Sequence, residues 1–360
     1  MERLLRVGIT HGDINGIGYE VILKTLDDTR MLEMCTPVVY GSAKIAAFYR
    51  KALDMQPVPM TQSAGAEEIH DGAINIINVV GEDVKVEPGV ETRAAGEAAL
   101  AALDQAVADL RAGLIDVLVT APINKHNIQR ESFDFPGHTE YLEARLGLDG
   151  DKALMILCSD DMRVALMTTH MPLSRVPHAI TREGIVEKLQ VLNRSLVRDF
   201  GIHAPRIAVL SLNPHAGEGG LLGTEEQEII APAIEDARGK KILAFGPYAA
   251  DGFFGSGLYH RFDGVLAMYH DQGLAPFKAL AMEAGVNFTA GLPYVRTSPD
   301  HGTGYDIAGK GEASEQSMRS AIFAAIDIYR NRLREDAATA NPLRRQYYSK
   351  GNDNVVLDLS

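Results

Sequence analysis

The chain is poor in several residue types, and each shortage narrows the class of protein. It has no tryptophan and only two cysteines in 360 residues. Cys35 and Cys158 lie far apart and form no CxxC pair, so the sequence predicts neither a disulfide framework nor a cysteine metal site. No apolar run approaches the ~18 residues of a membrane helix, and the apolar part of the N-terminus is too short for a signal peptide. We therefore expect a cytoplasmic protein with no membrane partner.

Positive charge is also scarce. The chain has 35 Lys and Arg against 48 Asp and Glu, which gives a net charge of −13 and a pI of about 5.3. This balance disfavours nucleic acid as a partner, because phosphate backbones bind basic surfaces. A local basic pocket for a small phosphorylated ligand is still compatible with it. The 46% of hydrophobic residues indicates a globular protein with a sizeable core.

Short aliphatic runs alternate with longer helical patterns along the chain. Strands are expected at 4–10, 36–42, 73–80, 115–122, 163–170, 206–215, 240–247 and 262–270, and helices at 19–34, 43–53, 93–113, 182–200, 224–237 and 313–335. Strands that alternate with helices in this way predict an α/β fold with a mostly parallel sheet.

Four of the predicted strands lead into a polar turn that carries a histidine. These histidines are His126, His170, His215 and His270. Ligands of parallel α/β sheets bind at the carboxyl ends of the strands, so we expect the imidazoles along one sheet edge. Three imidazoles would suit a divalent transition metal, with a carboxylate or substrate oxygens completing the shell. Ordinary loop or core histidines are the alternative.

Two glycine-rich loops are candidates for close contact with a ligand. The stretch "GDINGIG" at 12–18 lies between a predicted strand and helix, and "DHGTGYDIAGKG" at 300–311 precedes the last helix. Glycine lets the backbone approach a bound group closely. A lone glycine-rich turn is a weak signal, because such turns also serve plain packing.

The stretch "FPGHTEYLEARLG" predicts a helix that begins at an N-cap Thr139 and ends at Gly147. The exposed amides of a helix start bind anions, although a plain capped helix is the simpler reading. Lys278 and Arg296 are candidates for a phosphate or carboxylate clamp, with solvated surface charges as the alternative.

Eight blocks of the sequence, in order from about residue 6 to 312, resemble the 4-hydroxythreonine-4-phosphate dehydrogenase family of pyridoxal phosphate synthesis. The blocks are "GDINGIGYEVILKTL", "VTAPINK", "FPGHTEYL", "MTTHMPLSRV", "LNPHAGEGGLLGTEE", "GPYAADGFF", "YHDQGLAPFKAL" and "VNFTAGLPYVRTSPDHGTGYDIAGKG". The first and last blocks are also similar to loops of isocitrate and isopropylmalate dehydrogenases, a related group. The first loop departs from the usual "TPGDPAGIGPE", because His11, Ile14, Asn15 and Tyr19 stand here and three prolines are lost.

The resemblance implies an α/β fold like that of isocitrate and isopropylmalate dehydrogenases, with two α/β domains and a cleft between them. We expect a cofactor-side domain at 1–130 plus 293–345. We expect a metal, substrate and dimerisation domain at 131–292 and a C-terminal tail at 346–360. The family also implies a homodimer whose active site is shared across the interface, with His270 and its neighbours facing the partner's site.

The family pattern implies a role for each matching site residue. One divalent metal per site (Zn, Mg or Co) would be bound by His170, His215 and His270, and the phosphorylated substrate by His138, Thr139, Lys278, Asn287 and Arg296. The cofactor would lie against Gly12, Asp13, Gly16, Gly18, His301, Gly302 and Asp306. Asp251 matches a carboxylate beside the metal and, with Lys278, is a candidate for proton transfer. His126 matches no family ligand, so we expect it to be an ordinary loop residue.

The reaction implied by the resemblance is NAD-dependent oxidation of 4-phosphohydroxy-L-threonine, with NADP also possible. The product, 2-amino-3-oxo-4-phosphobutanoate, would decarboxylate to 3-amino-2-oxopropyl phosphate. The nearest alternative is the same chemistry on D-threonate or D-erythronate 4-phosphate. A transferase that binds a phosphorylated ligand on a similar fold without a dinucleotide is a more distant alternative.

Overall fold

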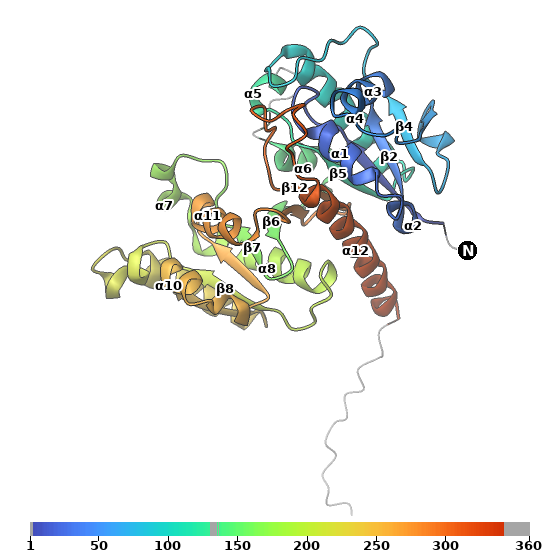
Figure 1. Cartoon of the computed structure of the whole chain (residues 1–360). Coiled ribbons are helices and arrows are strands. Elements are labelled where there is room, and N and C mark those ends of the chain that lie inside the picture. The colour runs from blue at the N-terminus through green and yellow to red at the C-terminus, as the bar shows by residue number, and fades with distance from the viewer. Residues whose placement is uncertain (1–2, 130–134, 136, 342–360) are drawn as a thin grey trace, which may run out of the picture.

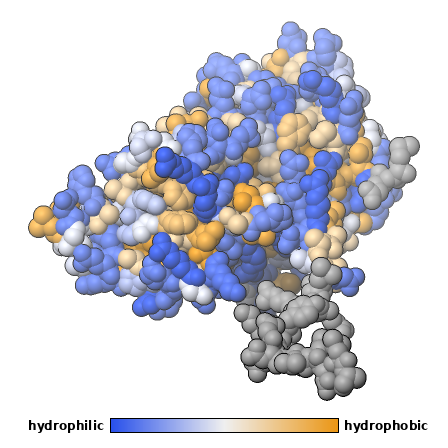
Figure 2. All heavy atoms as spheres, turned by 90° about the horizontal axis from the view of Figure 1, so that it is seen from below, coloured by the Kyte–Doolittle hydropathy of each residue, from blue (hydrophilic) through white to orange (hydrophobic). Residues whose placement is uncertain are grey.

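The computed structural model describes residues 3–129, 135 and 137–341. The tail predicted at 346–360 lies outside the described residues. No helix in the described part of the chain is long and apolar enough to cross a membrane. Figure 2 shows hydrophilic side chains over much of the face seen from below, with apolar residues in smaller groups among them.

A twelve-stranded sheet runs through the molecule in the order β3-β4-β2-β1-β5-β12-β11-β6-β7-β10-β8-β9. The strands are β1 (Leu5–Thr10), β2 (Cys35–Gly41), β3 (Met60–Ser63), β4 (Ile74–Asn78), β5 (Val117–Thr120), β6 (Leu154–Cys158), β7 (Arg163–Leu166), β8 (Arg206–Leu210), β9 (Leu243–Tyr248), β10 (Gly264–Ala267), β11 (Val286–Ala290) and β12 (Arg296–Pro299). Figure 1 shows β1 to β5 with their helices at one end of the molecule and β6 to β10 at the other. The domain boundaries stay a prediction.

Helices cover both faces of the sheet, and α12 packs against β5, β11 and β12 near its middle. The helices are α1 (Gly18–Leu26), α2 (Met31–Met34), α3 (Ala43–Ala52), α4 (Arg93–Arg111), α5 (Lys125–Ile128), α6 (His138–Leu146), α7 (Val176–Ala179), α8 (Arg182–Arg198), α9 (Ala231–Gly239), α10 (Ala250–Gly255), α11 (His270–Ala281) and α12 (Gln316–Thr339). Short 3₁₀ turns are η1 (Ala66–Glu68), η2 (Leu173–Arg175), η3 (Pro214–Gly220) and η5 (Leu258–Arg261), and η4 (Glu226–Ile230) is a π turn before α9.

The α/β fold with a mostly parallel sheet is confirmed, but the centre of the sheet is antiparallel. Strand β11 runs antiparallel to β12 and β6, and β6 runs antiparallel to β7. The sequence reading missed β3, β6, β11 and β12. A short turn at 159–162 joins β6 to β7, and a connection this short permits only an antiparallel pair.

Two helix predictions were wrong in detail. The helix expected at 19–34 is split into α1 and α2 by a break at 27–30. Helix α6 begins at His138 with Gly137 as its N-cap, two residues before the predicted N-cap, and no side chain caps it. Thr139 is therefore not the N-cap, and Gly147 closes the helix as expected.

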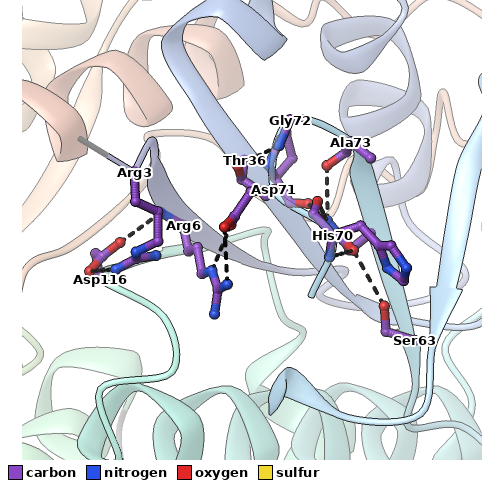
Figure 3. Close-up of polar contacts among 11 residues, drawn as sticks. Arg3, Arg6, Thr36, Ser63, His70, Asp71, Gly72, Ala73 and Asp116 are labelled. Atoms are coloured by element: carbon purple, nitrogen blue, oxygen red, sulfur yellow. Dashed lines mark hydrogen bonds and ion pairs between the residues drawn. The ribbon is translucent and has the colours of Figure 1, made fainter. Parts of the chain in front are cut away.

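A polar cluster fixes the amino ends of four parallel strands, at the edge opposite the cavity described below (Figure 3). Asp116, just before β5, accepts bonds from the backbone N–H of Arg6 at 2.7 Å and from the Arg3 guanidinium at 2.9 Å. Asp71 pairs with Arg6 at 2.9 Å, and Thr36 accepts the N–H of Gly72 at 3.0 Å. These bonds hold β1, β2, β4 and β5 in register.

Aromatic stacking replaces the prolines missing from the first loop. The His11 ring stacks on Tyr19, with 5.3 Å between centroids, and Tyr19 stacks on Tyr49 at 5.7 Å. Tyr49 donates its hydroxyl to the carbonyl of Ile14 at 2.7 Å. Asn15 donates to the carbonyl of Val90 at 2.8 Å. The loop is thus held by packing and hydrogen bonds in place of ring constraints.

His11 should make the fold sensitive to acid. Its side chain is fully buried, neither ring nitrogen has a hydrogen-bond partner, and burial lowers its pKa to about 4. The unfolded chain binds the proton more tightly, near pH 6.5, so stability is present above that pH and is lost as the pH falls toward 4. The loss attributable to His11 should reach about 3 kcal/mol.

A His11→Phe variant should keep the stacking and remove this titration. Urea unfolding at several pH values between 4 and 7 should give a flatter profile for the variant than for the parent. His203→Phe, at an exposed position, should leave the profile unchanged. Parallel profiles for His11→Phe and the parent would contradict the role of His11.

Candidate functional site

A cavity of about 340 Å³ lies at the carboxyl ends of β5 and β12. Nine of the predicted site residues line it. They are His138, Thr139, Lys278, Asn287 and Arg296 from the substrate set, His170 and His270 from the metal set, and His301 and Gly302 from the cofactor set. The structure thus gathers all five predicted substrate residues, from β11, β12, the amino-terminal end of α6 and the last turn of α11, into one cavity.

Arg296 is a buried cation whose bonded neighbours are uncharged. The residue is 1% exposed and lies at the start of β12. Its guanidinium donates to the Thr120 hydroxyl at 2.5 and 3.0 Å and to the Thr289 hydroxyl at 3.1 Å. Burial lowers the pKa of Arg296 to about 9, so the group is still charged at neutral pH. A buried charge without a counter-ion is costly, and an anionic ligand would compensate it.

Three residues around this cation carry buried polar atoms without a hydrogen-bond partner. The atoms are His138 Nε2, Asn287 Oδ1 and His301 Nε2. Burial lowers the pKa of His138 well below its ordinary value, and the charges of Arg296 and Lys125 lower it further. Unsatisfied polar atoms cost about 1–3 kcal/mol each, and a polar ligand would satisfy them.

Lys278 lies across the cavity and is the one predicted cation with an acidic partner. Its ammonium lies 3.5 Å from the Asp300 carboxylate and donates to the Asp300 carbonyl at 3.3 Å. Burial raises the pKa of Asp300, although Lys278 opposes the rise. Asp300 was not among the predicted site residues, although it is the first residue of the predicted glycine-rich loop at 300–311.

Two of the three predicted metal ligands are neighbours. The rings of His170 and His270 lie 6.1 Å apart, and His270 is the first residue of α11. Asp271 lies 2.7 Å from His270 Nδ1, and Glu140 lies 3.4 Å from His170 Nδ1. Imidazole nitrogens suit zinc or cobalt. Within the described ranges, however, no group of three His, Cys, Asp or Glu is placed to hold a metal.

His215 does not line this cavity and lies in a strained turn after β8. His215, Ala216 and Glu218 have φ values of 52°, 52° and 45°, and Gly217 and Gly219 also have positive φ. Left-handed backbone costs roughly 1–2 kcal/mol per non-glycine residue. The buried Glu226 carboxylate stabilises the approach to the turn by accepting the N–H groups of Leu212 and Asn213 at 2.8 and 2.7 Å.

Asp251 and His126 also lie apart from the predicted site residues of this cavity. Asp251 is exposed near the start of α10 and does not line the cavity. Of the two proton-transfer candidates, only Lys278 faces the cavity of its own chain. His126 is exposed and lies 2.5 Å from Glu91, outside the cavity.

The glycines of the first loop pack against the protein's own chain. A Cβ atom would lie 2.2 Å from the Pro122 carbonyl at Gly12, 2.6 Å from the Thr303 carbonyl at Gly16 and 2.1 Å from the His11 carbonyl at Gly18. These glycines therefore permit contacts among loops. The predicted contact of Gly12, Gly16 and Gly18 with a cofactor stays a prediction.

The two glycine-rich loops nevertheless lie together. Ile17 donates its N–H to the Thr303 carbonyl at 2.9 Å. Asp13 is buried, and its carboxylate accepts bonds from Tyr305, Asn127 and the loop backbone, so these polar groups already satisfy it. Asp306 is exposed, and a Cβ at Gly302 would meet no atom within 4 Å. Of the predicted cofactor residues, Gly302 and Asp306 are therefore the more accessible.

The sequence reading also missed Lys125, which follows β5 and reaches the cavity. Its Nζ lies 3.0 Å from His170 Nε2. Partial burial lowers the pKa of Lys125, and nearby Glu140 opposes this. The signal was present in the sequence, because "PINK" places a lysine just beyond a predicted strand end.

Comparison with known proteins agrees with this fold and cavity. Residues 33–325 match the model of the family described as pyridoxal phosphate biosynthetic protein PdxA. The chain is 62% identical over 358 residues to a 4-hydroxythreonine-4-phosphate dehydrogenase of Bacteroides thetaiotaomicron, covering 99% of this chain and 98% of the relative. It is 44% identical over 334 residues to the Prosthecochloris aestuarii protein of the same name, covering 91% and 98%.

A solved structure agrees as well. The crystal structure of 4-hydroxythreonine-4-phosphate dehydrogenase from Klebsiella pneumoniae superposes with a TM-score of 0.77 at 34% identity, covering 91% of this chain and 100% of that one. The match spans most of both chains in sequence and in structure. The chain belongs to the PdxA family of pyridoxal phosphate biosynthetic proteins.

Proposed function

We propose that this protein oxidises 4-phosphohydroxy-L-threonine at C3, with NAD as the hydride acceptor, in the synthesis of pyridoxal phosphate. Relatives that cover nearly the whole chain carry the name of this dehydrogenase. NADP is the alternative cofactor. The nicotinamide nucleotide would take the hydride from C3, and the accessible side of the 300–311 loop is the proposed region for its binding.

The charge of the cavity carries this proposal. In a protein of net charge −13, three cations line it, Lys125, Lys278 and Arg296, against the one carboxylate of Asp300. These groups give the cavity a formal charge of about +2. The proposed substrate carries a phosphate, a carboxylate and an ammonium group, so its net charge is about −2. A cavity of this sign concentrates such an anion.

The chemistry needs one oxidation and one C–C cleavage. The C3 hydrogen would leave with the electron pair of its bond as hydride, for which a bound nicotinamide would be the acceptor, while the C3 hydroxyl proton would pass to a base. The resulting 3-oxo acid then loses C1 as CO₂, and the electron pair of the broken C1–C2 bond forms an enol that is protonated at C2. Lys278 faces the cavity as a candidate for moving the proton, and Arg296 would fix an anionic group that does not react.

We also propose that His170, His215 and His270 hold one divalent cation, either Zn, Co or Mg. Bound there, it would supply Lewis-acid stabilisation of developing negative charge on oxygen. Two of these imidazoles face the cavity and the third lies on another loop, so one chain alone does not complete the set. This separation of the three histidines supports a homodimer in which each active site is built from two copies of the chain. His215 and Asp251 of one copy would then complete the site of the other copy.

An assay for NADH at 340 nm tests the function. The purified protein should form NADH with 4-phosphohydroxy-L-threonine, should need added divalent metal after chelation, and should release CO₂. D-Erythronate 4-phosphate and D-threonate 4-phosphate are the comparison substrates. Higher kcat/KM on either of these would contradict the proposed substrate, and no NADH with any of them would contradict the reaction. Light scattering of the same sample should give twice the mass of one chain.

A further inference from the structure

Lys125 differs from the other cations of the cavity in its surroundings. It is the first residue of α5, just beyond β5, and it enters the cavity from the rim. Its nearest polar partner is His170 Nε2 at 3.0 Å, an uncharged imidazole nitrogen when His170 is neutral. Among the residues that the structure describes, no carboxylate forms an ion pair with Lys125, whereas Lys278 has Asp300. Glu140 acts on this charge electrostatically without forming an ion pair, so the ammonium is still available to a ligand.

The ammonium of Lys125 lies beside the amino-terminal end of α6. A Cβ atom on Gly137, the N-cap of α6, would lie 3.4 Å from Glu140 Oε2, 3.5 Å from Lys125 Cε and 3.6 Å from Lys125 Nζ. The ammonium thus lies over the start of a helix whose first N–H groups have no side-chain cap. Helix starts favour anions, because those N–H groups and the helix dipole point toward them.

The His138 imidazole and the charge of Arg296 also act at the amino-terminal end of α6. The unpartnered His138 Nε2 belongs to the first residue of α6, and the charges of both Arg296 and Lys125 act on that ring. A tetrahedral anion with several acceptor oxygens can bond to an ammonium, a guanidinium, an imidazole N–H and helix amides together. A carboxylate also has about four acceptor sites, but they lie in one plane on two oxygens, so a tetrahedral anion fits donors that approach from several directions better.

We propose that Lys125 is a binding residue for the phosphate group of the substrate, at the amino-terminal end of α6. The inference rests on the proposed function, because it assigns one anionic group of that substrate. Lys125 supplies charge that is present in the ground state and in the transition state alike. Uniform binding of this kind governs KM and leaves kcat nearly unchanged.

Three variants test the assignment. Lys125→Met removes the charge and keeps an unbranched side chain, and Lys125→Arg keeps the charge. Lys44→Met is the matched control, since Lys44 is exposed on α3 and donates to the carbonyl of Glu82, outside the cavity. Each variant is measured for kcat, for KM of the phosphorylated substrate, and for the inhibition constant of inorganic phosphate. Phosphate binding to the enzyme without substrate is measured by calorimetry.

For Lys125→Met we expect KM and the phosphate inhibition constant to rise together by roughly 10- to 100-fold, with kcat within about threefold. Lys125→Arg should recover most of both losses, and Lys44→Met should behave as the parent. An unchanged phosphate constant, with or without a rise in KM, would overturn the assignment. So would a collapse of kcat at constant KM, because Lys125 would then act in the chemical step.

Calorimetry separates this inference from the proposed function. If the parent binds phosphate and Lys125→Met does not, the Lys125 subsite stands even when no candidate substrate yields NADH. If the parent oxidises the substrate but both proteins bind phosphate equally, the function stands and the Lys125 assignment is wrong.

Discussion

Replacing Arg296 by methionine should lower kcat/KM by about a hundred- to a thousandfold, or roughly 3–4 kcal/mol of transition-state binding. The guanidinium is 1% exposed and lies among uncharged hydroxyls, so its attraction for an anion is little screened by water. Methionine fills most of the same volume without charge. Steady-state kinetics with the phosphorylated substrate would measure the effect.

The same variant should not unfold the protein. A buried cation without a counter-ion contributes an unfavourable desolvation term, and its removal offsets the loss of bonds to Thr120 and Thr289. We expect thermal unfolding close to that of the parent. Arg296→Lys should be intermediate in activity, because it keeps the charge and loses the fork geometry. Arg111→Met, at the exposed end of α4, controls for net charge. Normal kcat/KM in Arg296→Met would show that the anion binds elsewhere.

Replacing Asp199 by alanine should lower the free energy of unfolding by about 3–5 kcal/mol. Asp199 lies at the end of α8 and pairs with Arg332 of α12 at 2.6 Å, and the two side chains are 3% and 7% exposed. Ser195 donates to the other Asp199 oxygen at 2.6 Å. Removing the carboxylate leaves the Arg332 charge buried without a counter-ion.

The control for this pair is an ion pair of similar length on the surface. Arg182 and Asp236 lie 2.5 Å apart with side chains 48% and 40% exposed. Asp236→Ala should cost under about 1 kcal/mol. The double variant Asp199→Leu with Arg332→Met should recover most of the lost stability. Circular dichroism during urea unfolding suits a chain without tryptophan. A loss below 1 kcal/mol for Asp199→Ala would contradict the argument.

The Asp199→Ala substitution should also disturb the cavity, through the connection between β11 and β12. Arg332 also donates to the carbonyls of Leu292 and Pro293, in the turn that joins these strands, at 3.2 and 3.0 Å. Asn287 and Arg296 lie on the same two strands. The buried pair thus anchors the hairpin that carries two of the predicted substrate-binding residues of the cavity.

Much of the fold was readable because the signals were local. Long helices such as α4 and α8 carry an apolar face, and each begins at a threonine, Thr92 or Thr181, whose side chain caps the first turn. Strands such as β1 and β10 are compact aliphatic runs before polar turns. Strands β6, β11 and β12 were not read, because four or five residues with no alternation do not distinguish a buried strand from a loop.

The sequence by itself determined the α/β class, the family and the residue types of the site. The histidines at 126, 170, 215 and 270 follow short apolar runs, and that local pattern suffices to place them at strand ends, whereas Lys278 and Arg296 were read only as candidate cations. The tertiary structure alone decided which of them meet. It brought Lys125 to His170 across 45 positions and placed Thr120 against Arg296 across 176, and it left His215 and Asp251 outside the cavity. The physical reason is that strand order and strand direction set these distances. Both depend on which buried faces pack together, and local periodicity does not encode that choice.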